Sequence, residues 1–134
     1  MKKKQLYAKK VKGKGRGVFC TGPIAKDEII ETCPVIVLPS CDYEIVKESH
    51  LIDYFFHFNK EEQTIALVLG FGSLYNHTKD SNASYRLDQE NKVMIYYAVC
   101  DIPAHREICI NYGGDPGQEY KEWFEARNIV YKSA

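Results

Sequence analysis

Two short segments of this sequence combine side chains that could hold a ligand and orient a reacting group. The first is Tyr75-Asn76-His77, and the second is Ile110-Asn111-Tyr112-Gly113. An asparagine amide carries both a donor and an acceptor, and a phenol can stabilise or orient charge near it. A Ser-His or Cys-His hydrolase is set aside, because Ser73 and Cys109 stand in no recognisable nucleophile setting.

A third segment, Gly13-Lys14-Gly15-Arg16-Gly17, has three glycines in five residues. Glycine lets the backbone adopt unusual angles and approach a ligand closely. Taken alone, this loop is better explained as a turn between strands or as an Arg/Gly-type nucleic-acid arm. It points to a ligand site only together with the other two segments.

The histidines and cysteines show no pattern typical of a metal site. Three histidines have no ligand spacing with one another or with a cysteine: His50, His57 and His105. The five cysteines contain no Cys-x-x-Cys pair. We therefore expect no bound metal, and cysteines that are reduced and mostly buried.

The charge is unevenly distributed along the chain. Residues 1–17 hold seven Lys, one Arg and no acid, whereas the whole chain has 18 basic and 18 acidic residues, so residues 18–134 sum to 10 − 18 = −8. An acidic body attracts lysine-rich segments and repels nucleic acid. A basic protein is thus the expected partner, nucleic acid is disfavoured, and the basic arm is interpreted first as a solvated strand.

No stretch approaches the ~20 apolar residues of a membrane span, and the start Met-Lys-Lys-Lys is not followed by an apolar signal core. We expect a soluble, intracellular protein with no membrane partner. It would be cytoplasmic in a bacterium, or able to reach the host nucleus if it is a viral protein or an effector.

Short β-branched and aromatic runs predict a mostly β chain in a single domain over residues 1–134. Within it, residues 1–12 are a basic strand or arm, and residues 113–134 are a closing segment with a helix. The expected strands are residues 5–11, 18–20, 28–38 (one strand, or two broken at Pro34), 51–58, 64–69, 83–87, 93–99 and 107–112. The loop at residues 88–91 predicts a hairpin. Short helices are expected over residues 42–49 and 118–127.

Taken in chain order, the three segments resemble the motifs of the SET-domain protein lysine methyltransferases: the glycine loop is the first motif, the Asn-His segment is the second, and the segment ending in Tyr112-Gly113 is the third. Gly15-Arg16-Gly17-Val18-Phe19 is similar to the family's Gly-x-Gly motif, and residues 71–83 are similar to its Asn-His-Ser-x-x-Pro-Asn run. Residues 106–113 are similar to its Glu-Glu/Leu-Ile/Thr-x-x-Tyr-Gly run. Asp53-Tyr54-Phe55-Phe56 and the short length look closest to the minimal SET proteins of viruses and bacteria.

The resemblance implies a SET domain: a β-clip of small sheets with short helices, whose C-terminal segment is threaded as a pseudoknot beside the Asn-His motif. It also implies transfer of a methyl group from S-adenosylmethionine to a lysine amine, with S-adenosylhomocysteine as product. The protein substrate would expose that lysine in a basic segment, as a histone or ribosomal protein does.

The resemblance also assigns roles to residues. Tyr112 would be catalytic, and its phenol would orient the amine or the methyl group. The cofactor would be held by Lys14, Arg16, Gly17, Asn76, His77, Tyr112 and Trp123, with Trp123 stacked on the adenine. The lysine channel has four aromatic candidates, which are Tyr54, Phe56, Tyr75 and Tyr85.

Several positions depart from the family's pattern. Thr78 replaces the usual Ser, Ser81 replaces the usual Pro, and no cysteine-rich segment follows Tyr112, so the helix bearing Trp123 would close the site. Arg16 stands where the viral-type proteins can carry a tyrosine. Two alternative functions stay open: a non-catalytic SET-fold module that binds peptide or cofactor, and a basic-arm nucleic-acid binder. A homodimer through exposed strand edges also stays open.

Overall fold

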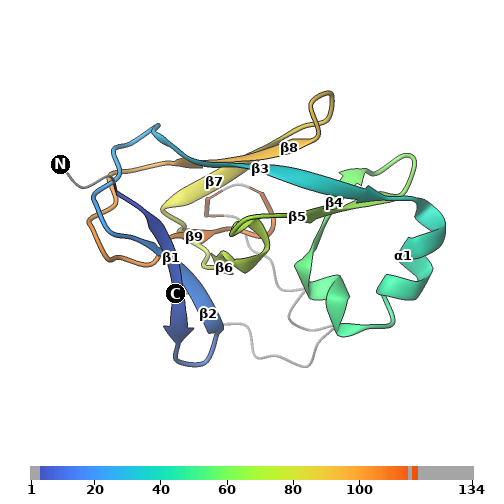
Figure 1. Cartoon of the computed structure of the whole chain (residues 1–134), viewed down its shortest axis with the longest axis horizontal. Helices are drawn as coiled ribbons and strands as arrows, with labels where there is room; N and C mark the ends of the chain where they lie inside the picture. Colours follow the sequence, from blue (N-terminus) through green and yellow to red (C-terminus); the bar gives the residue numbers. More distant parts are fainter. Residues whose placement is uncertain (1–3, 115, 118–134) are drawn as a thin grey trace.

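The computed structural model describes residues 4–114 and 116–117, and their architecture is mostly β (Figure 1). Strands of the described residues form an antiparallel hairpin, a five-stranded sheet and a parallel pair of short strands. The hairpin and the helix α1 (Ser40–Val46) lie at opposite ends of the long axis (Figure 1). The mostly β prediction is therefore confirmed.

The hairpin joins β1 (Leu6–Val11) to β2 (Gly15–Cys20) and pairs Lys10 with Arg16 across the strands. Gly13 and Gly15 have φ of 79° and 75°, which favours glycine at both turn positions. The sequence predicted a loop as far as Gly17, but strand β2 already begins at Gly15. Gly17 lies inside the strand, where a Cβ atom would collide with the carboxylate of Glu107.

The five-stranded sheet is antiparallel and has the order β4-β5-β3-β8-β7. Its strands are β3 (Ile29–Leu38), β4 (Phe55–Asn59), β5 (Thr64–Val68), β7 (Ala83–Asp88) and β8 (Val93–Ala98). Strand β3 is continuous through Pro34. It pairs with β8 up to Pro34 and with β5 from Val35 onward, so the proline, which has no N–H, sits where the partner changes. The predicted hairpin of residues 83–99 is confirmed by β7 and β8.

The described residues form one α-helix and two 3-10 helices. Helix α1 is followed by the 3-10 helix η1 (His50–Tyr54), and a second 3-10 helix, η2 (Gly72–Leu74), precedes the Asn-His motif. The prediction of a strand over residues 51–58 is wrong for its first half, because Ser49 Oγ accepts a hydrogen bond from Leu51 N and starts a helical turn. Only from Phe55 is the chain extended.

Two strands of two residues each complete the fold. Strand β6 (Asn76–His77) pairs in parallel with β9 (Cys109–Ile110), and Thr78 N donates to Ile110 O at 3.0 Å. The predicted last strand, residues 107–112, is thus much shorter than expected. The pairing nevertheless brings the third motif beside the Asn-His motif. The predicted helix of residues 118–127, with Trp123, lies outside the described residues.

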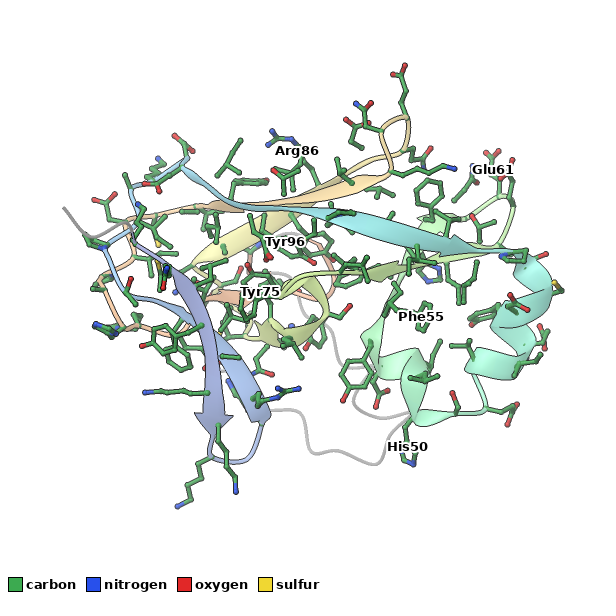
Figure 2. All side chains as sticks on the ribbon, in the orientation of Figure 1. His50, Phe55, Glu61, Tyr75, Arg86 and Tyr96 are labelled. Atoms are coloured by element: carbon green, nitrogen blue, oxygen red, sulfur yellow. The ribbon has the colours of Figure 1, made fainter. Side chains whose placement is uncertain are left out.

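The core lies between the five-stranded sheet and the β6-β9 pair. Tyr75 and Tyr96 stack at its centre with ring centroids 4.4 Å apart (Figure 2). Around them pack buried hydrophobic residues from several strands and from the loops between them: Val18, Ile24, Cys33, Val68, Met94, Ile102, Ile108 and Ile110. Within the described part of the chain, no helix is long and apolar enough to cross a membrane.

Candidate active site

His77 and Tyr112 are joined where β6 and β9 end. Tyr112 N donates to His77 Nδ1 at 3.0 Å, and the two rings lie 5.2 Å apart. This nitrogen must therefore be unprotonated. Burial, with the charge of Lys14 nearby, lowers the pKa of His77, which favours the same neutral form. His77 thus fixes the backbone at Tyr112.

One hydrogen bond holds the phenol of Tyr112, and another holds its backbone carbonyl. Its hydroxyl donates to Tyr75 O at 3.0 Å, and Tyr85 donates its own hydroxyl to Tyr112 O at 3.3 Å. Burial raises the pKa of Tyr112, and the carboxylate of Asp53 acts in the same direction. The phenol therefore stays protonated, which makes it a hydrogen-bond donor rather than a base.

Tyr75 is in turn fixed by Glu31. Its buried hydroxyl donates to Glu31 Oε1 at 2.8 Å, and Phe71 N donates to Glu31 Oε2 at 3.0 Å. Burial, followed by the charge of Glu31, raises the pKa of Tyr75. The Glu31 carboxylate thus holds two groups in place. One is the backbone at Phe71, before the Asn-His motif. The other is Tyr75, whose carbonyl accepts the hydrogen bond from the Tyr112 hydroxyl.

The first and second motifs meet the third at Glu107. Asn76 Nδ2 donates to Glu107 Oε2 at 2.7 Å and to Arg16 O at 3.1 Å. Asn82 holds the adjacent backbone, because its Nδ2 donates to Glu107 O and its Oδ1 accepts from Cys109 N, both at 2.9 Å. The three motifs that lie far apart in the sequence are thereby tied together by side-chain amides.

The turn after Tyr112 is also fixed by side chains. The fully buried Asn111 donates from Nδ2 to Lys79 O at 3.1 Å and accepts from Gly113 N at 2.9 Å. Ser84 Oγ donates to Gly114 O at 3.1 Å. These contacts hold the Tyr112-Gly113 segment against β7 and against the chain after β6.

A cavity of about 500 Å³ opens beside Tyr112. Its walls are largely aromatic and aliphatic and come from α1, η1, β4, β5, β7 and β8. Three of the four predicted channel residues line it, namely Phe56, Tyr75 and Tyr85, and the Phe56 and Tyr85 rings meet edge to face at 5.4 Å. Tyr54 does not line it; that side chain is 45% exposed at the end of η1.

Five polar lining residues were not foreseen from the sequence: Tyr43, Asp53, His57, Lys60 and Ser73. Asp53 stands in the quoted Asp53-Tyr54-Phe55-Phe56 segment, so its position was signalled although its role was not. Glu31 and Glu107 were also missed. Glu107 lies inside the third motif, but nothing in the sequence marks Glu31.

The predicted cofactor residues fall into three groups. Arg16, Gly17 and Asn76 converge around Glu107, and His77 follows directly in β6. Lys14 is exposed at the hairpin turn, and its charge is near enough to lower the pKa of His77. Trp123 lies outside the described residues. Among residues 4–114 and 116–117 no group of three His, Cys, Asp or Glu side chains could hold a metal ion.

Comparisons with known proteins agree on one family. The family model of the SET domain matches residues 15–113. A curated relative, the H3 lysine-37 specific histone-lysine N-methyltransferase of Schizosaccharomyces pombe, is 34% identical over 101 residues, which cover 75% of this chain and 67% of the relative.

Solved structures share the fold. A Plasmodium falciparum protein assigned as a histone methyltransferase superposes with a TM-score of 0.66 and 37% identity, over 83% of this chain and 99% of that one. The polycomb repressive complex 2 of Chaetomium thermophilum gives a TM-score of 0.64 at 21% identity, over 85% of this chain but only 15% of the other, and so shows the fold alone.

Proposed function

This chain belongs to the SET-domain family of protein-lysine methyltransferases, and we propose that it transfers a methyl group from S-adenosylmethionine to a lysine side chain of a basic protein. The observation that carries the proposal is the position of Tyr112. It lies at the cavity and, through His77, beside the Asn76-Glu107 cluster. One tyrosine thus lies between a cavity that would take the substrate and a polar cluster that would hold the cofactor.

The residues around Asn76 fit the amino-acid end of S-adenosylmethionine. That end carries an ammonium and a carboxylate, and it meets here a carboxylate, a backbone carbonyl and a side-chain amide, with the exposed cations Lys14 and Arg16 beside them. The absence of a side chain at Gly17 keeps the strand close to Glu107. Arg16, Gly17, Asn76 and His77 would therefore hold the cofactor, which supplies an electrophilic methyl group on a sulfonium.

The cavity suits a lysine side chain. Aromatic and aliphatic walls can pack along its methylene groups, and desolvation lowers the pKa of an amine, which favours the neutral nucleophile. Asp53, in the wall of the cavity, would attract the protonated lysine side chain before its amine reaches Tyr112. The phenol of Tyr112, held by Tyr75 O, would then orient the amine toward the methyl group.

The charge of the chain supports a basic substrate. Residues 18–134 carry a net charge of 10 − 18 = −8, so a lysine-rich segment of a histone or ribosomal protein is attracted to this part. Such a substrate places the site of action inside the cell.

The proposal is tested with labelled S-adenosylmethionine and separate histone and ribosomal protein mixtures. We expect wild type to label a lysine in at least one mixture, and Tyr112→Phe to be slower by about 10² to 10³. Tyr97→Phe is the matched control, since no hydrogen bond to its hydroxyl is described, and it should label like wild type.

Three results would change the proposal. Equal labelling by wild type and Tyr112→Phe would remove Tyr112 from the reaction. Measurable cofactor binding without labelling of any mixture would favour the non-catalytic module that binds peptide or cofactor. DNA affinity that falls steeply with salt, and that is lost when residues 1–12 are deleted, would favour the nucleic-acid binder.

A further inference from the structure

The side-chain amide of Asn76 has only one chemically consistent orientation. Its two described contacts are Glu107 Oε2 at 2.7 Å and Arg16 O at 3.1 Å. A carboxylate and a backbone carbonyl can only accept hydrogen bonds, so both contacts require the NH₂ group of the amide. A flipped amide would place its oxygen against two other oxygens. The hydrogen-bond partners therefore fix which way the amide points.

Because both N–H bonds of Asn76 are directed at these acceptors, its Oδ1 atom is turned away from them. Asn76 is half-buried, and no partner of Oδ1 is described among residues 4–114 and 116–117. The side chain thus presents an acceptor to the site. Arg16 O and Glu107 Oε2 are the neighbouring oxygens, so this corner of the site is rich in acceptors and suits a cation.

We propose that Glu107 is a positioning residue of the reaction, which locks the amide of Asn76 so that its oxygen faces the ammonium group of the cofactor. This inference rests on the proposed use of S-adenosylmethionine and goes beyond it. In this arrangement Asn76 accepts from the ammonium, and it does not donate to the cofactor's carboxylate. Glu107 acts through Asn76 and needs no contact with the cofactor.

The position of Glu107 suits this role. Its backbone oxygen accepts from Asn82 Nδ2 at 2.9 Å, and its side chain lies so close to Gly17 that no Cβ fits there. The carboxylate is therefore confined between the glycine-containing strand β2 and the Asn-His motif. A shorter or rotated side chain would leave the amide free to turn over.

The experiment measures binding of S-adenosylhomocysteine by calorimetry to wild type, Glu107→Gln, Asn76→Asp and the double variant Asn76→Asp/Glu107→Gln. Glutamine can both donate and accept, so Glu107→Gln no longer forces one orientation, and we expect about fivefold weaker binding. Asn76→Asp places two carboxylates together and should weaken binding by about 100-fold or more.

The double variant decides the question. The glutamine amide that replaces the Glu107 carboxylate can donate to the new aspartate, which leaves an acceptor facing the cofactor, so binding should return to within about tenfold of wild type. If Asn76 instead donated to the cofactor's carboxylate, the aspartate would repel it in either background. A double variant as weak as Asn76→Asp alone would therefore overturn the proposal.

Two controls separate this inference from the proposed function. Glu61→Gln makes the same chemical change in the exposed turn after β4 and should bind like wild type. An S-adenosylhomocysteine analogue without the α-amino group should show smaller losses across the variants; equal losses would contradict the role of the ammonium. Wild type that binds no S-adenosylhomocysteine would overturn both proposals, whereas wild-type binding with no rescue overturns this one alone.

Discussion

The cavity beside Tyr112 lies between two regions that are held in place in different ways. The inner wall, formed by Tyr75, Tyr85 and Tyr112, is fixed by hydrogen bonds from all three phenols, to Glu31, to Tyr112 O and to Tyr75 O. The outer wall is formed by α1 and η1. Only Val46 is buried in these two helices, and Ile45 and Leu51 are 72% and 57% exposed.

The difference separates the demands of chemistry from those of recognition. Methyl transfer needs an in-line approach at close range, and the inner wall provides fixed groups for it. A wall with little buried surface opens and changes at low cost in free energy. We therefore expect substitutions in the outer wall to alter which substrate segment is accepted, with less effect on Tyr112 than substitutions in the inner wall.

The strongest test of the inner wall is Gly72→Ala in η2. A Cβ atom at this buried position would collide with Val68 and come within 3.2 Å of the Tyr96 hydroxyl. We expect a loss of about 3 kcal/mol in the free energy of unfolding. Urea denaturation measures it, and a wild-type midpoint would show that the region adjusts more easily than its packing indicates.

Tyr75→Phe removes the hydrogen bond between Glu31 and the residue that accepts from the Tyr112 hydroxyl. The ring can still stack on Tyr96, but Glu31 loses the hydroxyl that donates to it at 2.8 Å. The expected loss is about 2 kcal/mol. Tyr43→Phe in the outer wall is the matched change and should stay within about 0.5 kcal/mol. Equal losses in the two variants would remove the distinction between the walls.

A pH titration tests His77. Burial and Lys14 lower its pKa below the ordinary value of 6.5, so below that value the unfolded chain binds the proton and the folded chain resists it. This contribution to stability is present above pH 6.5 and is lost as the pH falls toward the folded pKa. The urea midpoint should therefore fall more from about pH 7.5 to about pH 5.5 for wild type than for His77→Asn. Parallel curves would contradict the burial of a neutral imidazole.

The smallest effect is expected for Ile45→Ser on the outer wall. This side chain is 72% exposed, so its replacement removes little buried surface. The free energy of unfolding should change by less than about 0.5 kcal/mol, as followed by thermal denaturation. A loss several times larger would mean that α1 packs against more of the chain than the described contacts show.

The sequence predicted which segments form strands better than it predicted where each strand begins and ends. Residues 83–99 formed the predicted hairpin and residues 64–68 a strand, and in β8 every second residue is buried against the core. The aromatic run of residues 51–58 was misleading, since aromatic residues are common in strands, yet the local capping by Ser49 produced a helical turn first. Of the two possibilities left open at Pro34, the single strand is confirmed, because a change of strand partner accommodates the proline.

The sequence predicted the site residues that belong to the three motifs. It did not predict the residues that hold them in place. The order of the three motifs was enough to place Asn76, His77 and Tyr112 in one site. Glu31 and Glu107 were missed because acidic side chains usually face solvent, and only the folded chain shows the groups that bind them. Tyr54 was predicted because it matches a tyrosine of the viral-type proteins, but it ends η1 with an exposed side chain and does not line the cavity, whereas Phe56 in β4 does.

The pairing of β6 with β9 also affects how the protein folds. The hairpins β1-β2 and β7-β8 join neighbouring segments, whereas Tyr112 meets His77 across 35 positions and Asn76 meets Glu107 across 31. Contacts that close long loops carry a larger entropic cost and tend to form after local ones. We therefore expect both hairpins to form before the contacts that would hold a cofactor. Affinity for the cofactor would then report on a late step of folding.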